Sequence, residues 1–82
     1  MMNEKDIYDK LNEVFQVVFD DNSIIVNSTT NSSDIDDWDS LEHINLLVAV
    51  EQKFNIKFNM SEVIDMNNVG DMVKTILNKL NK

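Results

Sequence analysis

A single serine stands between acidic residues at the start of the most apolar part of the chain. Within DDWDSLEHINLLVAVEQKF, residues 36–54, Ser40 directly follows Asp39, and His43 lies three positions further on. A serine hydroxyl in such a place has two kinds of chemistry open to it. It acts as a nucleophile where a base, an orienting third group and an oxyanion hole surround it, or it carries a phosphate ester that another protein attaches.

The residues needed for catalysis by this serine are missing from the pattern. His43 is the only histidine, and it follows Ser40 in a segment crowded with acids. The G-x-S-x-G motif of hydrolases is absent, because Gly70 is the only glycine. The lack of cysteine excludes a cysteine nucleophile, a disulfide and a thiolate zinc site. We therefore expect a protein that is not an enzyme.

The acids before the serine do not form a dedicated metal site. Asp34, Asp36 and Asp37 have suitable side chains, but the glycine and the distal glutamate of a calcium-binding loop are missing. In addition, Trp38 occupies a position where that loop has a ligand. We expect no resident metal ion.

Ser40 is predicted to be the first residue of a helix. Asp39 at the N-cap, with Glu42 three positions on, has the spacing of a capping box, which leaves the serine hydroxyl without a capping role. Backbone N–H groups and the macrodipole favour a phosphate at such a helix start. The pattern therefore favours Ser40 as a site for a phosphate ester, with an ordinary N-terminal serine as the alternative.

Four helices are predicted around this serine. The apolar period predicts a first helix over residues 5–19 and a second over residues 40–54, and a short third helix is expected to begin with Ser61 as its N-cap. Asn67 or Asn68 would cap the last helix, whose apolar stripe comprises Val69, Met72, Val73, Ile76, Leu77 and Leu80.

The connection over residues 20–39 has no helical period. It is rich in Asn, Ser, Thr and Asp, and its expected buried anchors are Ile24, Ile25, Val26 and Ile35. The predicted fold class is therefore all-α, a small irregular antiparallel four-helix bundle with a long first loop and a short third helix. We expect one domain over residues 1–82.

The second helix has more apolar residues than a small bundle can bury. On a helical wheel, one arc contains Leu46, Leu47, Val50 and Phe54, and an adjoining arc contains Leu41, Ile44 and Val48. We expect the adjoining arc to be an exposed apolar patch beside the serine, the alternative being a helix buried nearly all round. His43 lies on the inward side of this wheel, as a partly buried neighbour of Ser40.

The net charge of −8 is concentrated in the middle of the chain, where no lysine lies between Lys10 and Lys53 and arginine is absent throughout. This acidity argues against nucleic acid as a partner and favours basic proteins, with a merely solubilising surface as the alternative. The polar N-terminus and the lack of a long apolar run predict no membrane insertion, and we expect a cytoplasmic monomer.

The sequence from Asp39 onward resembles acyl carrier proteins. The D-S-L tripeptide is a weak motif alone, but Glu42, Ile44, Leu46–Glu51, Phe54, Ile56 and Phe58 continue the likeness along the second helix. The match extends through Val63 to the segment Asn68–Asp71 and to Ile76. The predicted first helix and the long acidic loop also agree in position, so the resemblance covers nearly the whole chain.

This resemblance implies that a phosphopantetheinyl transferase attaches 4′-phosphopantetheine from coenzyme A to Ser40. The arm would then hold acyl groups as thioesters for acyl-loading and acyl-transferring enzymes with basic docking surfaces. The positions that match the recognition residues of the family are Asp39, Leu41, Glu42, Ile44, Val48 and Glu51 on the second helix, and Val63 on the third.

Several residues depart from the pattern of the carriers of fatty-acid synthesis. Trp38 and His43 replace small residues, Asn45 and Gln52 stand where glutamates are frequent, and Met60 replaces an acid. The W-D-S-L form resembles carriers of specialised pathways, such as lipid, polyketide or surface-polysaccharide modification. An aminoacyl carrier, for instance for D-alanine, and an unmodified acidic adaptor are the alternatives. We expect His43 to contact the cargo at the entrance to the space between the helices.

Overall fold

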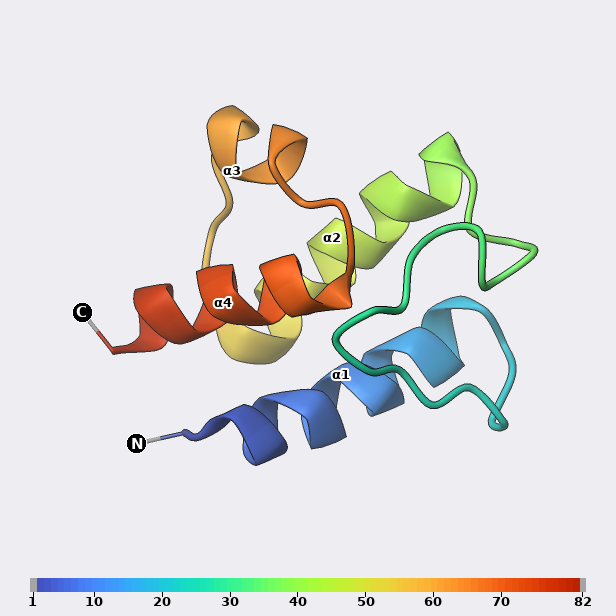
Figure 1. Ribbon diagram of the computed structural model, residues 1–82, viewed down its shortest axis with the longest axis horizontal. Coiled ribbons are helices and arrows are strands. Elements are labelled where there is room, and N and C mark those ends of the chain that lie inside the picture. The colour runs from blue at the N-terminus through green and yellow to red at the C-terminus, as the bar shows by residue number, and fades with distance from the viewer. Residues whose placement is uncertain (1, 82) are drawn as a thin grey trace.

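The computed structural model describes residues 2–81 of the chain, which form four helices and no strand. The helices are α1 (Glu4–Val18), α2 (Ser40–Phe54), α3 (Met60–Ile64) and α4 (Val69–Leu80). Figure 1 shows that α2 and α4 both run back along α1, while the short α3 lies apart from it. The predicted fold class, an irregular antiparallel bundle with a long first loop, is confirmed.

The core forms where the apolar stripes of the three long helices meet. α1 contacts both α2 and α4. The side chains that are completely or almost completely buried come from all three helices: Ile7, Leu11, Phe15, Leu46, Val50, Val69, Met72, Val73 and Ile76. Each side chain of this size contributes about 1.5–3 kcal/mol when it is buried. One small core therefore holds α2, with Ser40 at its first position, against α1.

Asparagine and aspartate side chains set the beginning of each helix. Asn3 caps α1, and Asn68 caps α4, which was one of the two expected caps. The predicted cap of α3 is wrong, because the side chain of Asn59 accepts from the backbone N–H of Glu62. Glu62 in turn accepts from the backbone N–H of Asn59, so this reciprocal pair starts α3 before Ser61.

Asp39 caps α2 as predicted, but Glu42 does not complete a capping box. The carboxylate of Asp39 accepts from the backbone N–H of Glu42 at 2.8 Å. The backbone N–H of Asp39 donates instead to the carbonyl of Asp37, and the carboxylate of Glu42 accepts from the side chain of Asn45. Ser40 is thus the first residue of α2, and none of these three bonds involves its side chain.

The long loop between α1 and α2 is held down by side chains of α1. Asn12 accepts from the backbone N–H of Val26 at 2.7 Å, and the amide of Gln16 donates to the carbonyl of Ile24 at 3.0 Å. Val26 is buried, whereas Ile25 is 72% exposed, so its predicted burial is wrong. The bond from Val26 to Asn12 holds this part of the loop against α1 with Val26 inward, and the side chain of Ile25 before it faces solvent.

The same loop is bonded to the beginning of α4. The backbone N–H groups of Val69 and Gly70 donate to the carbonyls of Thr30 and Ser28 at 2.8 and 3.0 Å. A Cβ atom on Gly70 would lie 2.7 Å from the carbonyl oxygen of Ser28, which is closer than real Cβ contacts come. The absence of a side chain at Gly70 is therefore what allows the loop to lie against α4.

Ion pairs join neighbouring helices at the surface. Lys53 of α2 contacts Glu13 of α1, and Lys79 of α4 contacts Glu62 of α3, each at 2.8 Å. The second pair is the less exposed of the two, and it helps to hold α3, which has no buried residue of its own. Among residues 2–81, no helix has the length and the apolar character that a membrane span requires.

Candidate functional site

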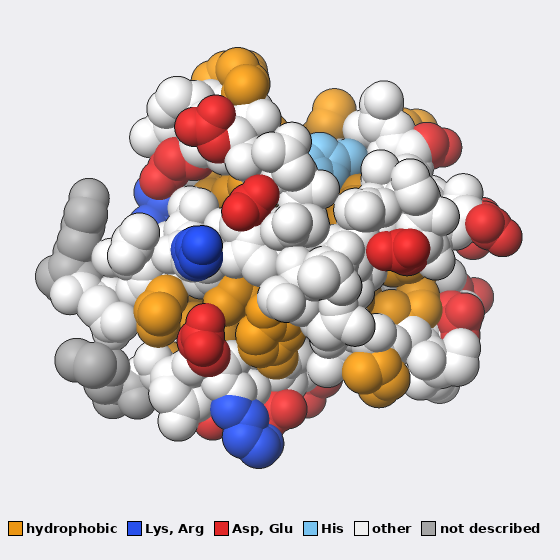
Figure 2. Space-filling model, in the orientation of Figure 1, with side chains coloured by type: hydrophobic (Ala, Val, Ile, Leu, Met, Phe, Trp, Pro, Cys, Tyr) orange, Lys and Arg blue, Asp and Glu red, His pale blue; other side chains and the backbone are white. Residues whose placement is uncertain are grey.

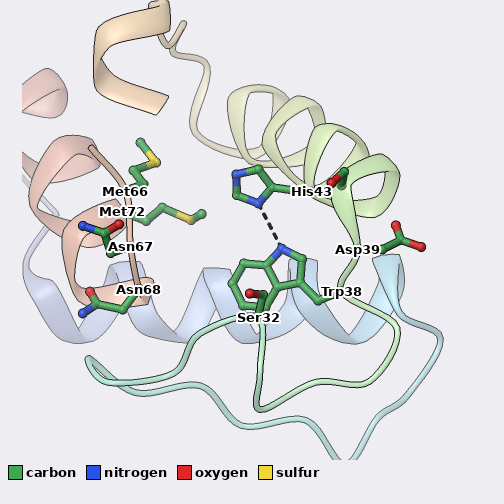
Figure 3. Close-up of a pocket in the computed structure, with 9 residues that line it drawn as sticks. Ser32, Trp38, Asp39, His43, Met66, Asn67, Asn68 and Met72 are labelled. Carbon is green, nitrogen blue, oxygen red and sulfur yellow. Dashed lines mark hydrogen bonds between the residues drawn. The ribbon is translucent and has the colours of Figure 1, made fainter. Parts of the chain in front are cut away.

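Ser40 lies at the edge of a pocket of about 470 Å³ between the start of α2 and the segment that leads into α4. Figure 3 shows Trp38 and His43 on one side of this pocket, with Met66, Met72, Asn67 and Asn68 facing them. The complete lining consists of Ser32, Trp38, Asp39, Ser40, His43, Met66, Asn67, Asn68 and Met72. The pocket thus combines an exposed hydroxyl with both apolar and amide side chains.

The hydroxyl of Ser40 has no hydrogen-bond partner among residues 2–81, and the residue is exposed. His43 does not act as its base, because Nδ1 of the imidazole accepts from the indole N–H of Trp38 at 2.9 Å. A hydroxyl without a base is suited to modification by another protein and is poorly suited to catalysis. Its place at the start of α2 favours an attached phosphate, since helix N–H groups lie beside it.

Trp38 belongs to the core as well as to the pocket wall. Only 8% of its surface is exposed, and its ring packs edge-on against Phe15, with the centroids 5.3 Å apart. The ring centroid of Phe19 lies 6.1 Å from that of the same indole. Trp38 therefore fills the space between α1 and the start of α2.

The contact between Trp38 and His43 was not predicted from the sequence, where Trp38 stood as a residue that breaks the calcium-loop pattern and as a departure from the family pattern. A signal for this contact was present. Trp38 directly precedes the cap Asp39, and His43 is the fourth residue of α2, which is the spacing of a hydrophobic staple. The predicted partial burial of His43 beside the serine is observed. Burial lowers the pKa of His43 below the usual value of 6.5.

The expected apolar patch lies on the outside of α2. Leu41, Ile44 and Val48 are 67%, 60% and 46% exposed, in agreement with the arc predicted from the wheel. Met60 and Ile64 of α3 are also exposed, and they were not predicted from the sequence to belong to an apolar patch. Their spacing of four on a helix is the signal that they share one side of it. Figure 2 shows apolar atoms exposed over α3, with acidic side chains nearby.

The remaining predicted recognition residues differ in their accessibility. Asp39 is exposed, whereas Glu42 and Val63 are half-buried. Glu51 is also half-buried, and its carboxylate accepts from the backbone N–H of Phe58 at 2.8 Å, which holds the turn after α2. The structure thus places Asp39 and Glu42 beside Ser40 and gives Glu51 a structural bond.

The acids of the loop do not gather around one point. Within the described part of the chain, no group of three His, Cys, Asp or Glu side chains is arranged to hold a metal ion. The ion pairs found in that part leave Asp34, Asp36, Asp37 and Asp39 without a lysine partner. These carboxylates form an acidic surface before the serine.

Comparison with known proteins agrees with this geometry. Residues 6–76 match the family described as phosphopantetheine attachment site. The structure is similar to the solution NMR structure of a holo acyl carrier protein from Geobacter metallireducens, with a TM-score of 0.86 and 43% sequence identity. The similarity covers 90% of this chain and 85% of that one. No curated protein matches the sequence.

The exposed hydroxyl, the helix start and the adjoining pocket fit a covalently attached phosphopantetheine group, and the matched family region contains all three. A carrier of this kind is not an enzyme, because other proteins perform the chemistry on its cargo. The chain belongs to the acyl carrier protein family, whose members carry acyl groups on covalently bound 4′-phosphopantetheine.

Proposed function

We propose that Ser40 is the residue that carries the arm and that the chain serves a specialised lipid, polyketide or surface-polysaccharide pathway. The observation that carries the attachment site is the hydroxyl of Ser40, which is exposed and has no partner in residues 2–81. It also lies at the start of α2 and at the edge of the pocket. No other serine of the pocket combines these properties, because Ser32 lies in the long loop.

The arm supplies the thiol that this cysteine-free chain lacks. The chain's own residues then have three tasks. The start of α2 stabilises the phosphate on Ser40 through its backbone N–H groups. Trp38 and His43 form one wall for the arm, and Met66 provides apolar surface on the other, where Met72 lies almost completely buried.

The outside of α2 is the proposed docking surface for the transferase and for the acyl-loading and acyl-transferring enzymes. Leu41, Ile44 and Val48 supply an apolar centre, and Asp39 and Glu42 place carboxylates beside Ser40. Such a small surface suits weak, short-lived complexes, and its charge speeds encounter with basic partners. Met60 and Ile64 of α3 are two further exposed apolar side chains.

The pocket also supports a second candidate cargo, an aminoacyl group. Asn67 and Asn68 provide amide groups in the lining, whereas the carboxylate of Asp39 points away from them in Figure 3. An ammonium group on the cargo would find acceptors there, whereas a plain acyl chain would use Met66 and Met72. Loading assays with acyl-activating and aminoacyl-activating enzymes distinguish the two.

The attachment site is tested by intact-protein mass after incubation with coenzyme A and a broad-specificity phosphopantetheinyl transferase. We expect the wild type to gain one phosphopantetheine and Ser40→Ala to gain none. Ser32→Ala is the matched control, since Ser32 lines the same pocket, and it should be modified like the wild type. A folded wild type that gains nothing would overturn the assignment and favour the unmodified adaptor.

A further inference from the structure

The hydrogen bond between Trp38 and His43 determines which nitrogen of the imidazole carries a proton. The indole N–H of Trp38 lies 2.9 Å from Nδ1 of His43. An indole N–H only donates, so Nδ1 must offer a lone pair. His43 is therefore a neutral imidazole in this arrangement, with its proton on Nε2.

Both partners of this bond are held in place by the fold. Trp38 is packed against Phe15 and Phe19 in the core, with 8% of its surface exposed. His43 is in the first turns of α2, where its backbone N–H donates to the carbonyl of Asp39 at 2.8 Å. The two ring planes differ by 24°, and Figure 3 shows the rings joined through their edges. The direction of the Nε2–H group is thus set before any ligand arrives.

The Nε2–H group faces the pocket. In Figure 3 this nitrogen points to the side where Met66 lies, away from Asp39 at the start of α2. Within residues 2–81 it has no hydrogen-bond partner. The single imidazole, pale blue in Figure 2, is visible in a hollow beside α3, so part of the ring is accessible from outside. The pocket therefore contains a fixed hydrogen-bond donor that the fold itself does not use.

We propose that His43 is a positioning residue whose Nε2–H donates a hydrogen bond to an amide carbonyl oxygen of the pantetheine arm, with Trp38 holding the required tautomer. This inference rests on the proposed attachment of the arm to Ser40. The bond would keep the arm against the pocket wall until an enzyme withdraws it. A single neutral bond suits this task, because it is strong enough to bias the arm and weak enough to be given up.

The amide carbonyls fit this donor better than the phosphodiester of the arm does. The phosphodiester would be attached at the start of α2, and Nε2 faces away from that end. An anionic phosphate beside the ring would favour the imidazolium form. An imidazolium has a proton on Nδ1 and cannot accept from Trp38, so the observed bond favours a neutral acceptor. The amide carbonyls lie further along the arm from the serine than the phosphodiester does, so they are the groups that could reach Nε2.

The first test concerns the tautomer and needs no arm. In spectra that correlate the ring nitrogens and protons of 15N-labelled apo protein near pH 7.5, we expect His43 to be protonated at Nε2 alone. Trp38→Phe keeps an aromatic ring in the core but removes the donor, and it should yield a mixture of the two tautomers. A mixture, or protonation at Nδ1, in the wild type would overturn the proposal.

The second test compares apo and holo protein whose modification has been confirmed by mass. The Nε2–H signal should shift on modification, and nuclear Overhauser contacts should appear between the arm and the methyl groups of Met66 and Met72. His43→Leu removes the donor, while His43→Gln retains an N–H donor. Loss of one hydrogen bond should weaken the arm contacts about two- to tenfold in the leucine variant, and the glutamine variant should recover part of them.

The possible results distinguish a failure of the proposed attachment at Ser40 from a failure of the proposed role of His43. No mass gain in the wild type contradicts attachment at Ser40 and leaves nothing for His43 to bind. A normal mass gain with an unchanged Nε2–H signal contradicts only the role of His43. Equal arm contacts in the leucine variant and the wild type, with both folded, would contradict it as well. Asn78→Ala, an exposed change on α4, is the control that should alter neither signal.

Discussion

Gly70 shows how one side chain, or the lack of one, controls the path of a long loop. Its backbone N–H donates to the carbonyl of Ser28, and the same carbonyl oxygen would lie 2.7 Å from a Cβ atom. That oxygen cannot move away without losing the bond. The residue is also in the first turn of α4, where a glycine is otherwise a poor choice.

Gly70→Ala should therefore destabilise the protein, although alanine favours helix. We expect a loss of at least about 1 kcal/mol in the free energy of unfolding, because the forced contact is with backbone and costs about 1–3 kcal/mol. Urea unfolding followed by circular dichroism measures the change. Asn78→Ala in the same helix should stay within about 0.5 kcal/mol of the wild type. A Gly70→Ala protein as stable as the wild type would show that the loop can shift freely.

His43 should make stability depend on pH in a defined window. Burial lowers its pKa in the folded state below 6.5, so the unfolded chain binds a proton first as the pH falls. The contribution of His43 is complete above pH 6.5 and is lost as the pH falls through the lower folded-state pKa. Protonation of Nδ1 would also end the bond from Trp38.

The measurement is urea unfolding between pH 5 and pH 8 for the wild type and for His43→Gln. We expect the wild type to lose stability below about pH 6.5 more steeply than the variant. The pKa values of Glu13 and Asp21 are lowered by their partners Lys53 and Ser23, so the stability they contribute is lost only as the pH falls below about 4.5 and 3.8, outside this window. Parallel curves for the two proteins would contradict a role of His43 in this window.

At the scale of elements, the cap of α2 is important for function because the first residue of this helix, Ser40, is the proposed attachment site. Asp39 accepts from the backbone N–H of Glu42 at 2.8 Å and has no second member of a capping box to support it. We expect Asp39→Ala to lower the free energy of unfolding by about 1 kcal/mol, and Asp39→Asn to lower it much less, since asparagine caps equally well. Thermal or urea unfolding checks this order, and equal losses in the two variants would contradict it.

The long helices were predictable from the sequence, and the loop was not. A stripe such as Ile7, Leu11 and Phe15 needs only local spacing to be recognised, and it placed α1 within one residue of its bounds. The path of the loop depends on polar side chains that reach distant backbone, as Asn12 does at Val26. Such bonds leave no periodic pattern in the sequence. Asparagine is also common in unstructured segments, so its presence does not identify the bond.

Only the part of the site that lies on one helix was predictable from the sequence. Ser40 and the exposed arc of α2 follow from positions on one helix, which local spacing determines. The pocket does not, because Met66 and Asn67 come from the segment after α3 and only the fold brings them to His43. The cap of α3 was misassigned because both Asn59 and Ser61 are good caps, and only Asn59 has Glu62 at the spacing of a capping box.

At the scale of the whole molecule, the net charge of −8 should govern how fast partners find the chain. We expect the double variant Asp39→Asn, Glu42→Gln to be modified more slowly by the transferase, with the largest difference at low salt. Charges separated by more than about 10 Å are screened at 0.1 M ionic strength, so added salt should narrow the difference. Initial rates of mass gain over a range of salt concentrations measure it.

A matched control variant removes two negative charges from another part of the surface. Glu4→Gln with Asp20→Asn changes two exposed acids outside the proposed docking surface, and asparagine tolerates the positive φ of Asp20. This control should be modified at nearly the wild-type rate. If both double variants slow equally, net charge alone matters, and the position of Asp39 and Glu42 beside Ser40 has no special effect.

The bonds from the loop to α4 also affect the order in which the chain can fold. Thr30 and Ser28 bond to Val69 and Gly70, which are far away in the sequence, so this contact closes a long stretch of chain at a considerable cost in entropy. That stretch contains all of α2 and α3. We therefore expect the start of α4 to gain these partners only after α2 and α3 have been brought together, so that the contact between the loop and the last helix forms late in folding.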